Sequence, residues 1–190
     1  SATRVDASQL IEKGRENIFV QSNQFDTTWI NSNSTETSGQ SGYDGSSDAW
    51  LLSKSGANGM ILQSVSTSGV NTFSVYAKAG SLSWMRFVVL GTGFADGYFN
   101  LTDGSLGSIS GDSITSSSEN IGGGWYRYTL VLNASTSQVR IYPADGNGNT
   151  SGTSGSIYIQ DSQLEQGLVA TPYIESGATT GKAGILENTP

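Results

Sequence analysis

From about residue 17 onward, apolar and polar residues alternate along the chain with a period of two. Short alternating runs separated by clusters of Gly, Asn, Asp and Ser are typical of β-strands joined by turns. The most apolar run, residues 83–90, is expected to be a central strand. Residues 31–47 are rich in Ser, Thr, Gly and Asn and are expected to be mostly turn. The expected strands are 17–21, 49–54, 59–64, 72–78, 83–90, 97–101, 107–110, 125–132, 138–142 and 155–165.

The pattern predicts an all-β protein of about ten strands with almost no helix. Each strand has one apolar face to bury, so two stacked antiparallel sheets, a β-sandwich, are the expected architecture. A chain of 190 residues is within the size of one such domain. We expect residues 1–16 to be a linker or arm, residues 17–174 the sandwich, and residues 175–190 a linker to a further module.

The amino-acid composition excludes several kinds of catalytic site and metal site. The chain contains no His and no Cys, so catalysis by Ser-His-Asp or Cys-His groups and His- or Cys-ligated metals are excluded. Glycoside hydrolysis by two carboxylates is compatible with this composition, but most Asp residues stand beside Gly or Ser, where they are typical of turns. The chain is therefore expected not to be an enzyme.

Net charge and hydropathy argue against nucleic acids and membranes as partners. The net charge is −7, with nine Lys and Arg, so the basic surface that nucleic acids require is missing. No apolar run approaches the roughly 20 residues that cross a bilayer, so membrane insertion is not expected. Only 13% of the residues are charged and 25 are Gly. This composition favours an extracellular or virion β-protein whose surface is polar through hydroxyls and amides.

Four phrases in the chain resemble carbohydrate-binding-module-like jelly rolls. They are residues 17–29 (NIFVQSNQFDTTW), 73–78 (FSVYAK), 124–127 (GWYR), and 157–165 (IYIQDSQLE) followed by 170–174 (ATPYI). This set is similar to domains of phage tail and head fibres and other virion appendages. The opening residues 2–6 and 10–12 also resemble the linker that precedes such domains.

The resemblance extends over nearly the whole chain. It implies a jelly roll located on the virion surface or outside the cell, used for adhesion to host or environmental glycans. In such domains a structural calcium ion is frequent. Fold alone does not determine function, so the ligand is left open.

Strand alternation suggests a binding face. On each strand it separates residues that point to the core from residues that point outward. Sugars bind to flat aromatic rings bordered by planar hydrogen-bonding groups. We therefore expect one sheet face to form a shallow groove lined by Tyr76, Lys78, Trp84, Arg86, Arg140 and Tyr142.

Two other uses of these side chains are open. The aromatic rings could pack under loops while the Arg residues pair with surface carboxylates, or the face could form subunit contacts. For Trp29, Trp50 and Trp125 we favour positions in the core.

For calcium, which prefers oxygen ligands, the resemblance places a site where the first and last strands meet. The candidate ligands there are Asp26, Asp48 and Asp161. The alternative is that each is a carboxylate of a turn or sheet edge.

The sequence thus predicts a non-catalytic carbohydrate-binding or adhesion domain of a phage fibre or similar appendage. The rival is a structural spacer or decoration domain that uses the same surface for contacts between copies, as a homo-oligomer within a fibre.

Overall fold

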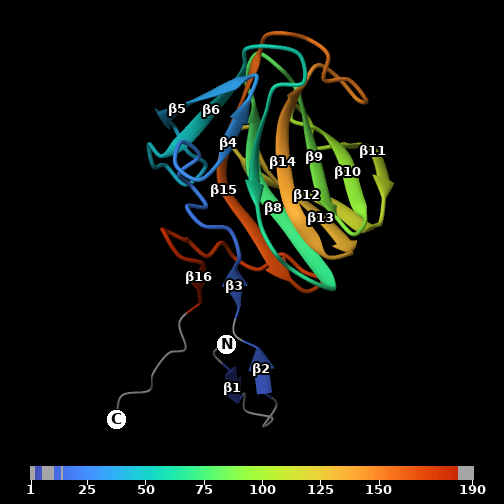
Figure 1. Ribbon diagram of the computed structural model, residues 1–190. Helices are drawn as coiled ribbons and strands as arrows, with labels where there is room; N and C mark the ends of the chain where they lie inside the picture. Colours follow the sequence, from blue (N-terminus) through green and yellow to red (C-terminus); the bar gives the residue numbers. More distant parts are fainter. Residues whose placement is uncertain (1–2, 6–10, 14, 184–190) are drawn as a thin grey trace.

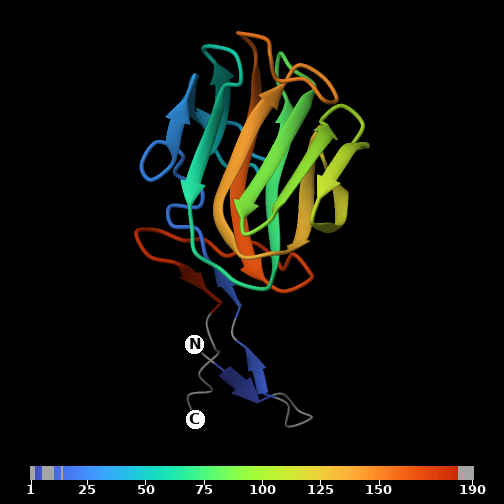
Figure 2. The same ribbon diagram turned by 45° about the vertical axis from the view of Figure 1, so that its right-hand side comes forward.

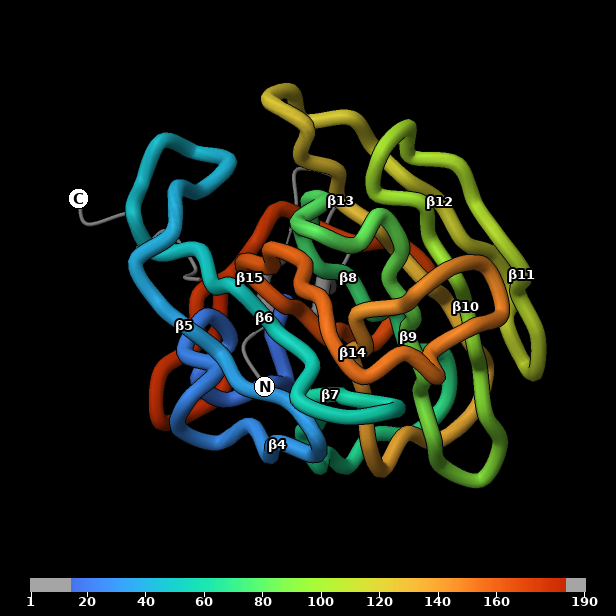
Figure 3. Tube along the Cα trace, turned by 90° about the horizontal axis from the view of Figure 1, so that it is seen from above, coloured from blue at the N-terminus to red at the C-terminus, as the bar shows by residue number. Residues whose placement is uncertain are grey.

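The computed structural model describes residues 3–5, 11–13 and 15–183, and these residues form strands and loops without a helix. Two antiparallel six-stranded sheets lie face to face (Figure 1). Seen from above, β14, β9 and β10 lie in one layer and β15, β8 and β13 in the other (Figure 3). The all-β sandwich predicted from the alternation is confirmed.

The first sheet, called here the front sheet, is the one turned toward the reader in Figure 2. Its strands, in spatial order, are β11 (Leu106–Gly111), β10 (Phe94–Asn100), β9 (Trp84–Gly91), β14 (Thr136–Ala144), β7 (Met60–Ser64) and β4 (Ile30–Ser32). The second, the back sheet, has the order β12 (Ser113–Gly122), β13 (Trp125–Asn133), β8 (Val70–Ala79), β15 (Ser156–Gln166), β6 (Ala49–Lys54) and β5 (Ser34–Gln40). Two short pairs complete the fold: β1 (Thr3–Val5) with β2 (Ile11–Lys13), and β3 (Glu16–Asn17) with β16 (Gly181–Lys182).

The connections between the eight central strands are those of a jelly roll. Strands β6, β15, β8 and β13 are neighbours in the back sheet, and β7, β14, β9 and β10 are neighbours in the front sheet. The chain therefore changes sheets from β6 to β7, from β7 to β8 and from β8 to β9, and β15, the last of the eight central strands, lies between β6 and β8. Two sheets connected in this way form the jelly-roll arrangement.

The core lies between the two sheets and is rich in aromatic residues. Alternation turns Phe73 of β8, Phe87 of β9 and Phe99 of β10 inward, and all three are fully buried. Their rings form a chain of contacts, with centroids 4.6 Å apart between Phe73 and Phe87 and 4.8 Å apart between Phe87 and Phe99. Tilted and edge-on ring contacts of this kind stabilise a core beyond the area they bury.

Three strands of the two six-stranded sheets were not predicted from the sequence pattern. Residues 34–40 form β5 inside the segment expected to be turn, β4 precedes it, and residues 113–122 form β12. All three are edge strands whose residues are mostly exposed or half-buried. A strand with two polar faces shows no apolar alternation, so the pattern could not reveal it.

The strand expected at 17–21 is wrong beyond its first residue. Only Glu16 and Asn17 are extended and paired, and the chain then turns through Gln21, whose φ is 51°. The apolar residues of this segment are buried all the same, because Phe19 packs edge-on against Phe73. In this segment the apolar residues therefore indicated burial correctly, but they did not indicate a paired strand.

The segments before and after the sandwich meet at one end of it (Figure 1). Strand β3 pairs with β16, and the backbone N–H of Gln21 donates to the carbonyl oxygen of Gly177 over 2.7 Å. The buried Asn17 amide donates to the carbonyl oxygens of Ser162 and Ile174. Residues 175–183 are thus hydrogen-bonded to the start of the domain, while 184–190 lie outside the described residues.

Candidate functional site

The six residues expected to line one groove belong to two different sheets. Trp84, Arg86, Arg140 and Tyr142 come from β9 and β14 of the front sheet, whereas Tyr76 and Lys78 come from β8 of the back sheet. The prediction of one shared face is wrong, because β8 and β9 are consecutive in the chain but lie in opposite layers. Alternation predicted correctly that the first four point away from the core.

The centre of the outer front face is an arginine fixed between two tyrosines. Arg86 of β9 lies beside Tyr98 of β10 and Tyr142 of β14 in the register. Its guanidinium carbon is 5.4 Å from the ring centroid of Tyr98 and 5.1 Å from that of Tyr142. Its Nε and Nη2 donate to the two carboxylate oxygens of Asp96, over 2.9 and 2.6 Å. A bidentate pair held between two rings leaves this guanidinium little freedom.

The electrostatics of this cluster follow from the same contacts. Hydrogen bonding to Asp96 raises the pKa of Arg86, so its charge is permanent. Burial raises the pKa of Tyr98, against the opposing effect of the Arg86 charge. The phenol is therefore neutral at physiological pH and can act as donor or acceptor.

Two further polar groups flank this cluster. Half-buried Trp84 lies against Gly107, where an added Cβ would come within 2.7 Å of the indole ring. On the other side, Arg140 donates from Nε to Gln138 over 2.5 Å and from Nη1 to the Tyr142 hydroxyl over 3.4 Å. The front face thus offers an indole, two phenol hydroxyls and a second guanidinium within three adjacent strands.

The outer face of the back sheet is covered where Tyr76 lies. The ring of Tyr43, from the loop before β6, stacks on that of Tyr76 with centroids 3.9 Å apart. Tyr76 is 8% exposed and packs with buried Trp125. Tyr76 therefore packs under a loop, which is the first of the two alternatives to a binding groove considered for these aromatic residues. Lys78, on the same strand, is half-buried.

The three other tryptophans are buried, as the sequence analysis favoured. Trp29 and Trp50 belong to the core between the sheets, and their indole N–H groups donate to backbone carbonyl oxygens. Trp125 is buried on the outer side of the back sheet instead, beneath Tyr43.

The carboxylates expected to hold calcium do not gather into a metal site. Asp26 and Asp48 are exposed, and Asp161 is buried. Within the described ranges, no group of three or more Asp, Glu, His or Cys is placed to hold a metal ion. Asp161 accepts a hydrogen bond from the Tyr43 hydroxyl over 2.8 Å, and Asp48 accepts one from the Gln160 amide over 2.7 Å. The predicted donor set does not fit the ion, and calcium has no support from these residues.

Asp161 has an unusual environment. It lies at an irregularity of β15, with a φ of 52°. Burial, followed by the charges of Asp48 and Asp44, raises its pKa to about 7, against the opposing hydrogen bond from Tyr43. Burial and the Asp161 charge raise the pKa of Tyr43 in turn, so Tyr43 donates the hydrogen bond at any physiological pH.

Three residues of these sites were absent from the sequence prediction. Tyr98 and Asp96 lie beside Arg86 only because β10 pairs with β9, and a strand pairing is not visible in the local pattern. Arg127 was noted within the GWYR phrase but given no role. It is 8% exposed on the outer side of the back sheet, which is rare for an arginine.

Comparisons with known proteins identify remote similarities of fold. No family model and no curated protein sequence matches the chain. A solved structure of the enzymatically active domain of bacteriophage CBA120 tailspike protein 4 matches with 17% identity and a TM-score of 0.45, covering 78% of this chain and 21% of that one. The CBM22-1–GH10 modules of a Clostridium thermocellum endo-1,4-β-D-xylanase, complexed with xylohexaose, match with 12% identity and a TM-score of 0.47, covering 83% of this chain and 29% of that one. The chain spans less than a third of each matched chain. Among the described residues, no helix is long and apolar enough to cross a membrane.

Proposed function

We propose that this chain is a non-catalytic carbohydrate-binding domain of a phage fibre or a similar surface appendage. The sequence resemblance supports the setting. The observation that carries the proposal is the outer front face, where half-buried Trp84 lies on the same face of β9 as Arg86, whose guanidinium is fixed by Asp96 and two tyrosines. The non-catalytic part is based on the absence of His and Cys from the sequence.

The chemistry of this face suits a sugar. Pyranose rings present C–H groups that pack on an aromatic face and hydroxyls that pair with planar groups. Trp84 is the candidate stacking surface, because Arg86 already occupies the space between the rings of Tyr98 and Tyr142. The phenol hydroxyls and Arg140 would then hydrogen-bond sugar hydroxyls. Because these groups are held by protein contacts before binding, little ordering would oppose association.

Binding to immobilised polysaccharide tests this proposal. The chain should be retarded on gels containing mucin, alginate or bacterial polysaccharide, and Trp84→Ala should weaken retention about tenfold or more, as loss of a central aromatic contact does. Ile114→Ala is the matched control, because Ile114 is an exposed apolar residue on β12 of the other sheet. Equal retention of Trp84→Ala and the parent chain, with unchanged melting temperatures, would remove Trp84 and this face from the proposal.

A structural spacer is the second candidate, and exposed apolar residues favour it. Ile30 of β4 is 57% exposed and Phe94 of β10 is 47% exposed. Both strands belong to the front sheet, where Ile30 shares a row of the register with Arg140. If this face joins copies of the chain, sedimentation should show an oligomer that Ile30→Ser and Phe94→Ser dissociate. A monomer at all concentrations would count against the spacer.

A further inference from the structure

A groove of about 210 Å³ lies on the outer side of the back sheet, far from the front face. Its floor is formed by β12 and β13, and its wall by residues 168–170 of the loop after β15. The lining combines hydroxyls with short apolar side chains: Thr115, Ser117, Thr129, Val131, Leu168 and Val169. Ala170 and two charged residues, Arg127 and Glu119, complete it.

Arg127 is held rigidly in this groove. Its Nη2 donates to the Ser74 hydroxyl over 3.0 Å and to the carbonyl oxygen of Thr171 over 2.6 Å. Its guanidinium carbon is 5.3 Å from the ring centroid of Tyr76, whose other side is covered by the stacked Tyr43. The guanidinium is therefore positioned by β8 and by the loop after β15 before any ligand arrives.

Among the described residues, no carboxylate pairs with the charge of Arg127. The residue is more than nine-tenths buried, and its Nε has no hydrogen-bond partner. Within the described part of the chain, the ion pairs within 4.0 Å are those of Lys54, Arg86 and Lys182. A buried guanidinium without a counter-charge is costly, because desolvation is not offset by an opposite charge. An anion entering the groove would supply the missing opposite charge.

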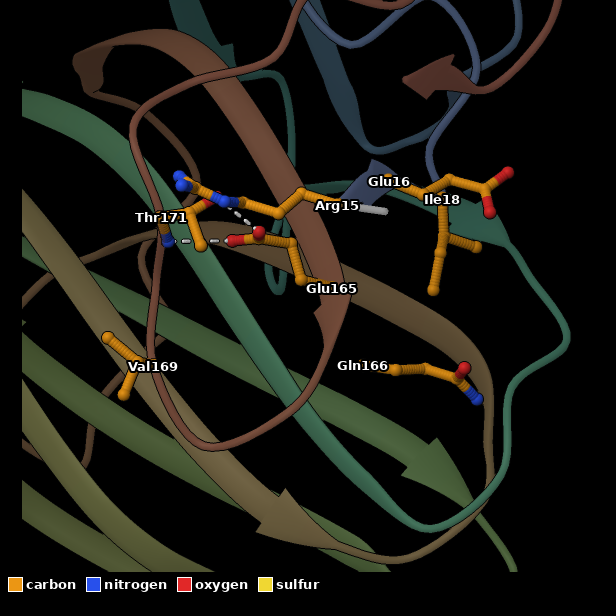
Figure 4. Close-up of a pocket in the computed structure, with 7 residues that line it drawn as sticks. All are labelled: Arg15, Glu16, Ile18, Glu165, Gln166, Val169 and Thr171. Atoms are coloured by element: carbon orange, nitrogen blue, oxygen red, sulfur yellow. Dashed lines mark hydrogen bonds between the residues drawn. The ribbon is translucent and has the colours of Figure 1, made fainter. Parts of the chain in front are cut away.

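The two nearby carboxylates, Glu119 and Glu165, do not form an ion pair with Arg127. Glu119 is opposite Arg127 in the β12–β13 register but is exposed at the rim. Glu165 is separated from Arg127 by Thr171: its Oε2 accepts from the Thr171 N–H over 3.0 Å and its Oε1 from the Thr171 hydroxyl over 2.5 Å. Figure 4 shows these contacts, with Arg15 reaching toward Thr171 and Glu165 from the other side. Both carboxylate oxygens of Glu165 thus accept hydrogen bonds from the loop that forms the groove wall.

We propose that this groove binds a carboxylated sugar residue, with the carboxylate at the Arg127 guanidinium. The hydroxyls of Ser117, Thr115 and Thr129 and the rim carboxylate of Glu119 would pair with sugar hydroxyls. Val169 and Leu168, 71% and 60% exposed, would lie against the apolar edge of the ring. This site is on the opposite sheet from the front face, so it goes beyond the proposed function and can fail independently of it.

Amide NMR spectra of the whole chain, titrated with small acids, test the proposal. The probes are sodium glucuronate, N-acetylneuraminate, the neutral methyl ester of glucuronic acid, and acetate. Millimolar glucuronate or N-acetylneuraminate should shift the amide signals of residues 115–119, 127–131 and 168–171 in a saturable way. The methyl ester should have no effect and acetate a weaker one. Whichever acid binds more tightly identifies the class of sugar.

Variants separate recognition from folding. Arg127→Gln should abolish the shifts, and Arg127→Lys should retain part of them. Because Arg127 also hydrogen-bonds the loop at Thr171, its replacement could disturb the fold, and Ser117→Tyr provides a second test. This variant fills the groove from an exposed strand position and should abolish binding while leaving the melting temperature unchanged. Thr37→Tyr on the far edge of the same sheet is its matched control. Glu119→Gln should tighten binding several-fold by removing a like charge.

Three results would overturn the proposal: equal shifts with the methyl ester and the acids, unaltered binding by Ser117→Tyr, or shifts confined to the front sheet. The last result would leave the proposed function of the front face intact.

Discussion

At the scale of single residues, the chain keeps several polar groups in buried positions where neighbours determine their charge. Asp161 is the clearest case, since it is 6% exposed and lies near Asp44 and Asp48. Its backbone adopts a left-handed conformation, which Asn and Asp tolerate better than most residues. The site therefore favours a short, neutral, hydrogen-bonding side chain.

This environment predicts a pH dependence of stability. The pKa of Asp161 is raised from 3.8 to about 7 in the folded chain, so the folded state binds the proton more tightly than the unfolded state. Its contribution is fully present below about pH 4 and is lost as the pH rises through about 7, on the order of 4 kcal/mol. Asp161→Asn should remove this loss, which denaturant unfolding at pH 5 and pH 8 can measure.

The other shifted carboxylates do not obscure this measurement. The pKa values of Asp44, Asp103 and Asp145 are lowered, so their contributions are lost only as the pH falls below about 4. If the difference in unfolding free energy between pH 5 and pH 8 is the same in Asp161→Asn as in the parent chain, Asp161 does not titrate in this range.

At the scale of elements, loops are tied to the sheets by side chains that the local pattern does not reveal. Lys54, the last residue of β6, has a fully buried side chain. Its Nζ donates to Asp145 over 2.8 Å and to the carbonyl oxygen of Thr150 over 2.9 Å. One lysine thus fixes the loop that follows β14 against a strand of the other sheet.

Lys54→Met keeps most of the buried stem and removes the charge. We expect a loss of about 2 kcal/mol in unfolding free energy, less than for a fully buried pair because Asp145 is partly exposed. Lys182→Met is the matched control: Lys182 and Glu16 are exposed and 4.0 Å apart, so its effect should be close to zero. If both variants lose a similar amount of unfolding free energy, burial of the Lys54–Asp145 pair does not contribute more to stability than an exposed pair does.

The elements also show how far sequence reasoning extends. Alternation identified most strands and the outward residues Trp84, Arg86, Arg140 and Tyr142, because burial of one strand face determines that pattern. It could not assign strands to sheets, and so placed Tyr76 with the front face. It also missed the serine-rich β12 and, with it, the groove around Arg127, because a strand polar on both faces carries no periodic signal.

At the scale of the whole molecule, the topology makes folding depend on contacts between distant residues. Strand β15 lies between β6 and β8, so β6, which pairs with β5 on its other side, gains its second neighbour only after nearly the entire chain is available. Folds dominated by such pairings form slowly and cooperatively.

A truncated chain tests this dependence. A chain ending at Gly155 lacks β15, and β6 and β8 would lose their shared neighbour. We expect it to show no cooperative thermal transition, whereas a chain ending at Ala183 should keep the parent transition. A cooperative transition in the shorter chain, followed by circular dichroism, would contradict the central role of β15.

The pairing of β3 with β16 has a mechanical consequence. Because the chain enters and leaves the sandwich at the same end, a pulling force between residues 15 and 183 acts first on this two-residue ladder, which opens one hydrogen bond at a time. The layered body carries no load until that ladder and the contacts of Asn17 and Gln21 have broken. Under tension we therefore expect a short extension at low force, as the β3–β16 pair opens, before any force acts on the two sheets of the sandwich.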